Sequence, residues 1–133
     1  MGLVVGSVIV EKIKVTEEQV ELFAKATGDF NPIHMDEEYA KKTRFGRRIA
    51  HGVLSAGFIS RVLAMKLGTG GIYLAQTLKF LKPVFIGEDI SVEIKVLTFR
   101  EERQIGTVET LVKNSQGEIA VKGEATIMLG KNF

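Results

Sequence analysis

The stretch VLSAGFISRVLAMKL, residues 53 to 67, decides the fold. Its apolar side chains nearly surround the helix axis, and few polar residues interrupt them: Ser55, Ser60, Arg61 and Lys66. A helix that is apolar on most of its sides has to be covered by other parts of the structure. The sequence therefore predicts a long central helix, which the glycines at positions 68, 70 and 71 are expected to end.

The residues after this helix predict strands. Residues 90 to 96 alternate between apolar and polar side chains, the period of two that is typical of a half-buried strand. Further strands are expected at residues 72–80, 84–86, 104–113 and 118–129, with a break or bulge near Pro83 and a turn at 114–117. Because short connections favour antiparallel pairing, the expected architecture is an α+β domain with an antiparallel sheet against the helix.

The residues before the central helix predict one strand and two shorter helices. Residues 8 to 15 are rich in β-branched side chains and are expected to form a strand. Thr16 is a candidate helix N-cap with Gln19 as its capping-box partner, and Gly28 is the expected end of that helix. Asp36 is expected to cap a second short helix over residues 37 to 43.

Length and composition exclude several classes of protein. The chain has 133 residues, a net charge of +2 and no cysteine, which predicts one domain over residues 1–133 without disulfides or thiolate metal sites. With two histidines and no cysteine, we expect no metal site. Basic residues are mostly interleaved with acidic ones, so no nucleic-acid partner is expected. No secretory signal or membrane-spanning stretch is found, which predicts a cytoplasmic protein without a membrane partner.

The segment TGDFNPIH, residues 27 to 34, is the strongest candidate for chemistry. A glycine and a proline interrupt any continuous helix there, so the chain can turn and bring Asp29 and His34 to one point. An Asp and a His that face one cavity can hold a water between them and move its proton near neutral pH. The alternative interpretation is a polar turn, in which Asp29 and Asn31 only satisfy backbone donors.

A second candidate is His51-Gly52, at the start of the central helix. A helix N-terminus presents unpaired N–H groups and a partial positive charge. Glycine there lets a carbonyl oxygen of a ligand approach the backbone closely, as an oxyanion site requires. The alternative interpretation is that Gly52 only eases the turn into the helix.

Two further features bear on ligand binding. The basic run KKTRFGRR, residues 41 to 48, contains Arg44, Arg47 and Arg48, which either contact a phosphorylated group or form a solvated loop. The segment GVLSAG lacks the glycine two residues before the serine that a nucleophile elbow needs, so Ser55 is expected to line a pocket and not to act as a nucleophile.

Three segments together resemble one known family. These are FAKATGDFNPIHMDEEYA (23–40), IAHGVLSAGFIS (49–60) and GIYLAQTLKFLKPVFIGEDISVEIKV (71–96), and they are similar to the MaoC-like, (R)-specific enoyl-CoA hydratases. The first segment carries that family's pattern: an aromatic residue, then G-D-x-N-P-x-H, then a small residue at Ala40. The resemblance extends over residues 8 to 129. It implies a hot-dog fold, in which an antiparallel sheet wraps a long central helix, and a homodimer.

The resemblance also implies an activity and roles for individual residues. The family adds water reversibly to a trans-2-enoyl thioester and gives an (R)-3-hydroxyacyl-CoA, with the acyl-CoA as substrate and no cofactor. By position, Asp29 and His34 would activate the water and supply the proton to C2, with Asp29 preferred as base and His34 as donor. Asn31 would orient this pair, the Gly52 N–H would bind the thioester oxygen, and Ser55 would line the pocket.

Other interpretations of the same resemblance stay open. His51 also matches the family pattern, and we expect it to be structural and not a proton carrier. The same fold and residue pair serve 3-hydroxyacyl-acyl-carrier-protein dehydratases of fatty-acid synthesis, which run the reverse reaction. A hot-dog thioesterase and a non-catalytic acyl-CoA-binding domain are the remaining alternatives. The expected role is in fatty-acid oxidation or in the supply of polyhydroxyalkanoate precursors.

Overall fold

The computed structural model describes residues 3–67 and 71–130. Along the chain the elements are β1 (Val8–Lys14), α1 (Glu17–Thr27), α2 (Pro32–Met35), α3 (Glu37–Lys41), α4 (Gly52–Lys66), β2 (Ile72–Gln76), β3 (Lys79–Phe80), β4 (Asp89–Arg100), β5 (Ile105–Lys113) and β6 (Ile119–Met128). Among these residues, no helix is long and apolar enough to cross a membrane.

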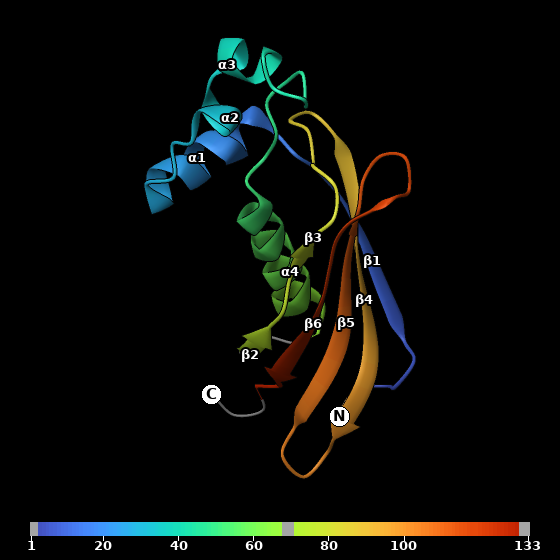
Figure 1. Ribbon diagram of the computed structural model, residues 1–133. Helices are drawn as coiled ribbons and strands as arrows, with labels where there is room; N and C mark the ends of the chain where they lie inside the picture. Colours follow the sequence, from blue (N-terminus) through green and yellow to red (C-terminus); the bar gives the residue numbers. More distant parts are fainter. Residues whose placement is uncertain (1–2, 68–70, 131–133) are drawn as a thin grey trace.

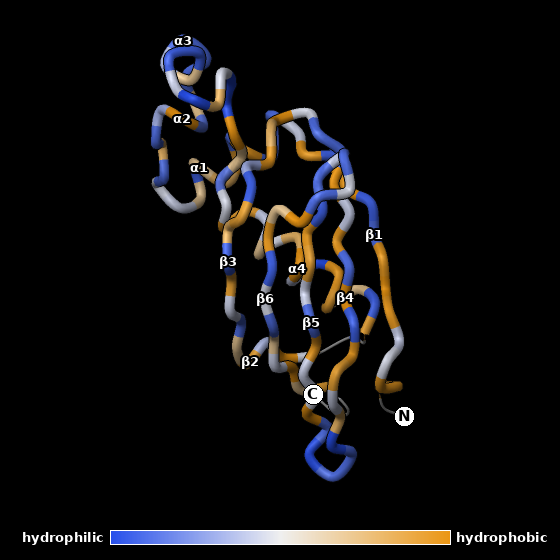
Figure 2. Tube along the Cα trace, turned by 45° about the vertical axis from the view of Figure 1, so that its right-hand side comes forward, coloured by the Kyte–Doolittle hydropathy of each residue, from blue (hydrophilic) through white to orange (hydrophobic). Residues whose placement is uncertain are grey.

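The strands form one antiparallel sheet that curves around α4 (Figure 1). The strand order is β1-β4-β5-β6-β2, and β3 also pairs with β6. Hydrophobic and hydrophilic residues alternate along β4, β5 and β6 (Figure 2), so one face of the sheet is apolar. The inner residues of the sheet, such as Val92 and Val108, share one buried core with Ile59 and Val62 of α4. The predicted α+β architecture, a long helix wrapped by an antiparallel sheet, is therefore confirmed.

Helix α4 agrees with its prediction along most of its length. Phe58, Ile59 and Val62 are buried against the sheet, whereas Val53 and Met65 are 57% and 75% exposed. The sheet covers only one side of the helix, which explains why part of its apolar surface faces outward. Of the three glycines predicted to end it, those at positions 68 and 70 lie outside the described residues.

The N-terminal elements follow from local signals. Thr16 and Gln19 form the predicted capping box, with hydrogen bonds of 2.8 and 3.2 Å between each side chain and the other residue's backbone N–H. Gly28 ends α1 in the left-handed region at φ 82°, where glycine has no steric cost. The helix expected over residues 37 to 43 is shorter, because α3 ends at Lys41.

Two predicted strands are different in the structure. The strand expected at residues 72–80 is broken into β2 and β3, and only Phe85 within 84–86 pairs, through an isolated bridge to Ile49. At the break, the Thr77 N–H donates to the Glu124 carbonyl at 2.9 Å, and the Thr77 hydroxyl accepts from the Glu124 N–H at 3.0 Å. The Thr77 side chain thus takes part in the pairing with β6, which interrupts the regular ladder.

Candidate active site

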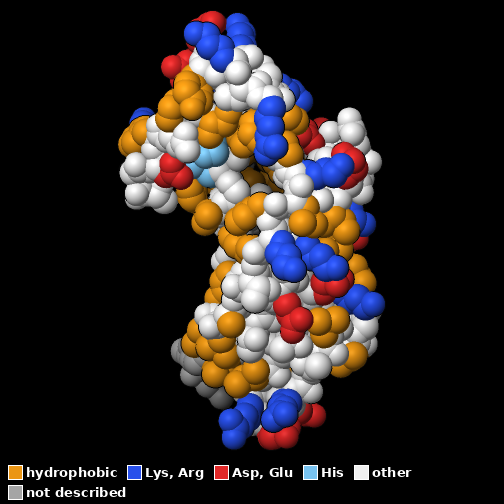
Figure 3. All heavy atoms as spheres, in the orientation of Figure 1, with side chains coloured by type: hydrophobic (Ala, Val, Ile, Leu, Met, Phe, Trp, Pro, Cys, Tyr) orange, Lys and Arg blue, Asp and Glu red, His pale blue; other side chains and the backbone are white. Residues whose placement is uncertain are grey.

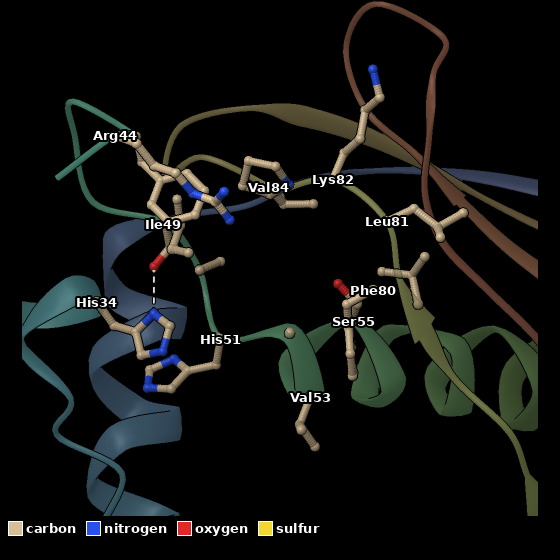
Figure 4. Close-up of a pocket in the computed structure, with 15 residues that line it drawn as sticks. His34, Arg44, Ile49, His51, Val53, Ser55, Phe80, Leu81, Lys82 and Val84 are labelled. Carbon is tan, nitrogen blue, oxygen red and sulfur yellow. Dashed lines mark hydrogen bonds between the residues drawn. The ribbon is translucent and has the colours of Figure 1, made fainter. Parts of the chain in front are cut away.

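The candidate site is a cavity of about 360 Å³ where the N-terminus of α4 meets α2 and the segment after β3 (Figure 4). At the surface, histidine side chains lie near a hollow that hydrophobic and basic side chains border (Figure 3). The lining residues are His34, Arg44, Phe45, Ile49, Ala50, His51, Gly52, Val53, Ser55, Phe80, Leu81, Lys82, Pro83, Val84 and Val121. The cavity thus collects residues from distant parts of the sequence.

The loop between α1 and α2 positions Asp29 through local hydrogen bonds. The Asp29 carboxylate accepts from the Asn31 N–H at 3.2 Å, and the Asn31 side chain accepts from the Ile33 N–H at 3.3 Å as the N-cap of α2. Asp29 and Asn31 therefore do satisfy backbone donors, as the polar-turn interpretation expected. The Asn31 side chain caps the helix that carries His34, so Asn31 acts on the cavity indirectly, through the position of that helix.

His34 is held with one ring nitrogen free. Its Nδ1 lies 2.7 Å from the carbonyl oxygen of Ile49 (Figure 4). Because a carbonyl only accepts, Nδ1 carries the hydrogen, and Nε2 of the neutral ring keeps a lone pair. Burial lowers the pKa of His34, an effect that the Ile49 carbonyl and the charge of Asp29 oppose and His51 reinforces. The neutral, proton-accepting form is thus favoured near pH 7.

The structure brings Asp29 and His34 together, as the sequence predicted. One carboxylate oxygen of Asp29 and one ring nitrogen from each of His34 and His51 all lie within 4.8 Å of one another. His34 and His51 are buried, whereas Asp29 is exposed to solvent. A water oxygen that lies about 2.8 Å from each of two acceptors can donate one hydrogen to each of them. Two acceptors less than 4.8 Å apart are close enough for this. The arrangement can therefore hold a reacting water.

The same three residues are the candidate metal ligands in the described part of the chain. Each histidine already uses one nitrogen on a backbone carbonyl, His34 on Ile49 and His51 on Asp29. The two rings also stack, with centroids 4.0 Å apart and planes at 33°. One nitrogen of each ring is thus already taken by a backbone carbonyl, and that no metal is bound here remains our prediction.

The N-terminus of α4 opens into the cavity at Gly52. His51 is its N-cap residue and gives no side-chain capping hydrogen bond, so first-turn N–H groups stay available to a ligand. The Phe80 ring packs directly on Gly52: a Cβ at this position would lie 2.8 Å from two of the ring carbons. Glycine is needed here for this close approach, and Phe80 is a site residue that the sequence did not indicate.

We expect Gly52→Ala to lower kcat/KM for the reaction proposed below by about tenfold or more, because the new methyl group must displace either Phe80 or the first turn of α4. The half-exposed Phe80 ring can move away, so the melting temperature should change little. Adding Phe80→Ala to Gly52→Ala should recover part of the activity, and Phe80→Ala alone is the control. Full activity of Gly52→Ala would contradict a close approach of substrate to this backbone.

The remaining predicted residues fall into different places. Ser55 is buried and lines the cavity, and Arg44 lines it from the opposite side. Arg47 stacks over the Phe85 ring, 4.0 Å from its centroid, beside a neighbouring hollow of about 210 Å³. Arg48 is turned away to Glu17 and Glu37, with N···O distances of 2.5 and 3.2 Å.

Two cavity features could not be anticipated from sequence motifs. Lys82, two residues after β3, lies at the rim of the cavity and pairs with Glu118, the residue directly before β6. The Ile49 carbonyl fixes the tautomer of His34, and a backbone group carries no signal in the sequence. Lys82, next to Pro83, resembles an ordinary surface residue in the sequence. Only the folded chain shows that it lies at the cavity.

Comparisons with known proteins agree on one family. The family described as MaoC like domain matches residues 6–118. The chain is 42% identical over 112 residues to an (R)-specific enoyl-CoA hydratase from Aeromonas caviae, with 84% of each chain covered. It is 39% identical to a 3-hydroxybutyryl-CoA dehydratase from Methylorubrum extorquens, covering 97% of this chain and 82% of that one.

Two more similarities bear on substrate and fold. A 3-hydroxyacyl-[acyl-carrier-protein] dehydratase from Solanum lycopersicum is 34% identical, covering 96% of this chain and 78% of that one. The solved structure of an (R)-hydratase from A. caviae, described as involved in PHA biosynthesis, superposes with a TM-score of 0.92 at 39% identity, covering 96% and 98% of the two chains. The hot-dog fold is thus confirmed.

Proposed function

The chain belongs to the MaoC-like domain family, and from this premise we propose that it catalyses the reversible (R)-specific hydration of trans-2-enoyl-CoA to (R)-3-hydroxyacyl-CoA. The enzyme is a hydro-lyase, as are the hydratases and dehydratases to which it is similar. The observation that carries the proposal is the pairing of Asp29 with a neutral His34 beside the open N-terminus of α4.

The proposed reaction begins with one water held by Asp29 and His34. Both groups accept its hydrogens, which aims an oxygen lone pair at C3 of the enoyl thioester. As the C3–O bond forms, one O–H bond of the water breaks and its proton passes to the pair. The pair then gives a proton to C2 on the same face of the substrate, and the second water hydrogen stays on the new hydroxyl. This relay produces syn addition without any other proton source.

The lowered pKa of His34 bears on the choice of base. The sequence favoured Asp29 as base and His34 as proton donor, but a donor must hold its proton first. In the free enzyme, burial keeps His34 neutral, so its Nε2 acts as an acceptor until water has been deprotonated. We therefore treat the two groups as one unit with shared titration, in which the proton delivered to C2 originates from the water.

The proposed oxyanion site is the N–H of Gly52. Negative charge develops on the thioester oxygen when water adds to C3, because the C2–C1 bond gains enolate character. Unpaired N–H groups and the partial positive charge of the α4 N-terminus stabilise this charge. Ser55, buried one turn along, would line the acyl side of the cavity.

No cofactor is expected, since the CoA thioester is the substrate. Arg44 and Lys82 line the cavity, and Arg47 lies in the adjoining hollow, so these three cations are proposed to meet the CoA phosphates. Arg48 was also a candidate for phosphate binding. Its two ion pairs favour a different role, joining α1 to α3 around the site.

The test is hydration of crotonyl-CoA, followed as loss of the ultraviolet absorbance of the conjugated thioester, with chiral analysis of the product. We expect the (R)-3-hydroxy product. An (S)-product, or release of free CoA thiol, would contradict the proposal, the latter by indicating a thioesterase. Binding of acyl-CoA without turnover of any enoyl thioester would support the non-catalytic alternative.

The second candidate function is dehydration of a 3-hydroxyacyl thioester carried by acyl carrier protein. The similarity to the tomato enzyme supports it. Both functions use the same residue pair, so a comparison of kcat/KM for matched CoA and carrier-protein substrates separates them. A place in fatty-acid metabolism or polyhydroxyalkanoate precursor supply, and a cytoplasmic location, remain proposals.

We also propose that the protein is a homodimer. Val53, Phe80 and Leu81, near the mouth of the cavity, are each more than half exposed and offer an apolar surface to a second copy. Light scattering should give about twice the chain mass of 14.6 kDa. A monomeric mass at micromolar concentration would contradict the dimer.

A further inference from the structure

His51 is almost fully buried at the inner wall of the cavity, between the catalytic pair and α4. It is 2% exposed and is the residue directly before the first turn of α4. Its Nε2 donates to the backbone carbonyl of Asp29 at 2.9 Å, a contact between residues 22 positions apart. Its ring stacks against His34 and, on another side, lies 4.7 Å from the centroid of Phe23 in α1.

The Asp29 loop is otherwise held by bonds to its own neighbours. The Asp29 N–H contacts the Thr27 hydroxyl at 3.2 Å, and the Phe30 N–H donates to the Gly28 carbonyl at 3.2 Å. Such local bonds fix the shape of the loop but not its position relative to other elements. The bond from His51 ties the loop to the start of α4, the element that carries the proposed oxyanion site.

We propose that His51 is a positioning residue, which sets the Asp29 carboxylate and the His34 ring relative to the N-terminus of α4. This inference rests on the proposed function. One ring performs both tasks. Its Nε2–H holds the Asp29 backbone. Its face supports the ring of His34, which lies against it in Figure 4. The other nitrogen, Nδ1, is buried and lacks a hydrogen-bond partner among the described residues, so the hydrogen bond to Asp29 is made by Nε2 alone.

The two tasks can be separated by substitution. His51→Phe keeps a flat ring for stacking but loses the N–H donor. His51→Gln loses the ring but places an amide N–H near the position of Nε2. We expect His51→Phe to lower kcat about ten- to a hundredfold with KM changed less than about threefold, because misplacing a reacting group costs the chemical step more than binding. His51→Gln should regain at least tenfold of the lost kcat.

A pH measurement adds a readout that a purely structural role would not move. The groups that face His34 are Asp29, His51 and Arg48, the last through a 3.5 Å contact to the His34 carbonyl. His51 contributes to the lowered pKa of His34, so its loss should raise that pKa. If the neutral His34 is the active form, the acidic limb of the kcat/KM profile should then move to higher pH in His51→Phe.

The experiment combines kinetics with NMR. The chain has two histidines, so the single imidazole that remains in His51→Phe belongs to His34, and its titration can be read directly. A wild-type kcat and an unshifted His34 titration in folded His51→Phe would overturn the proposal. So would equal loss of kcat in His51→Gln and His51→Phe, because the hydrogen bond would then not matter.

Two further measurements complete the test. If His51→Phe does not fold, His51→Asn replaces it, because its shorter amide reaches the Nδ1 position and not that of Nε2. His51→Asn should then have a kcat at least tenfold lower than that of His51→Gln. Failure of the proposed function is seen separately, as wild-type protein that turns over no enoyl or 3-hydroxyacyl thioester. The NMR titration of His34 still tests positioning in that case.

Discussion

Asp29→Asn is expected to reduce kcat/KM for crotonyl-CoA hydration by a factor on the order of 10² or more. The amide is nearly the same size as the carboxylate and can still accept the hydrogen bond from the Asn31 N–H, so the loop should keep its shape. An amide cannot accept a proton from water, however, and it adds N–H donors where the reacting water needs an acceptor. The melting temperature should therefore stay close to that of the wild type.

A nearby carboxylate provides the matched control. Asp36 caps α3 by accepting from the Tyr39 N–H at 3.1 Å, and Asn is an equally good N-cap residue. Asp36→Asn changes the net charge by the same amount as Asp29→Asn, so it reports any general electrostatic effect. Near wild-type activity is expected for it. Equal losses in the two variants would show that charge near the cavity, and not proton transfer at Asp29, is responsible.

His34→Ala should be impaired to a similar extent, for a related reason. It removes the acceptor lone pair on Nε2 and also leaves the Ile49 carbonyl without its donor. Because Asp29 and His34 act on one water, the double variant should be only slightly slower than either single variant. Multiplied losses in the double variant would show that the two groups act independently, which would contradict the shared relay.

Local patterns in the sequence were sufficient to predict α1, α3, α4 and the antiparallel sheet, but not the four-residue helix α2, which lies where a turn was expected. Helix α1 begins at its Thr16 cap and ends at Gly28, and both signals lie within the helix's own stretch of sequence. The alternation of Ile90, Val92 and Ile94 likewise needs no knowledge of distant segments. The proximity of Asp29 and His34 followed from a short interrupted segment and from the family resemblance.

Features that depend on pairing between distant residues were missed. The break after β2 exists because Thr77 bonds to Glu124, 47 residues away, and nothing near Thr77 indicates it. The basic run around Arg48 left phosphate contact and a solvated loop both open, and the pairing of Arg48 with Glu17, 31 residues away, was not anticipated. His51 was expected to be structural, while its bond to the Asp29 backbone could be seen only in the folded chain.

The same break predicts the largest effect on stability. A Cβ at Gly123 of β6 would lie 1.8 Å from the Thr77 carbonyl oxygen and 2.8 Å from Nε2 of Gln76. The first contact is with backbone, which no side-chain rotation can relieve. Gly123→Ala must therefore separate the β2–β3 segment from β6 and break both hydrogen bonds between Thr77 and Glu124. We expect the free energy of unfolding to fall by about 3 kcal/mol or more.

For a chain of this size, that loss corresponds to a melting temperature lower by roughly 10 °C or more. Glu124→Ala is the control in the adjacent position: its side chain is exposed, and its backbone bonds to Thr77 are kept, so the change should stay within about 0.5 kcal/mol. Because β3 carries Phe80 against Gly52, residual folded Gly123→Ala should also lose activity beyond the fraction unfolded. An unchanged melting temperature in Gly123→Ala would show that β2–β3 does not cross β6 at this glycine.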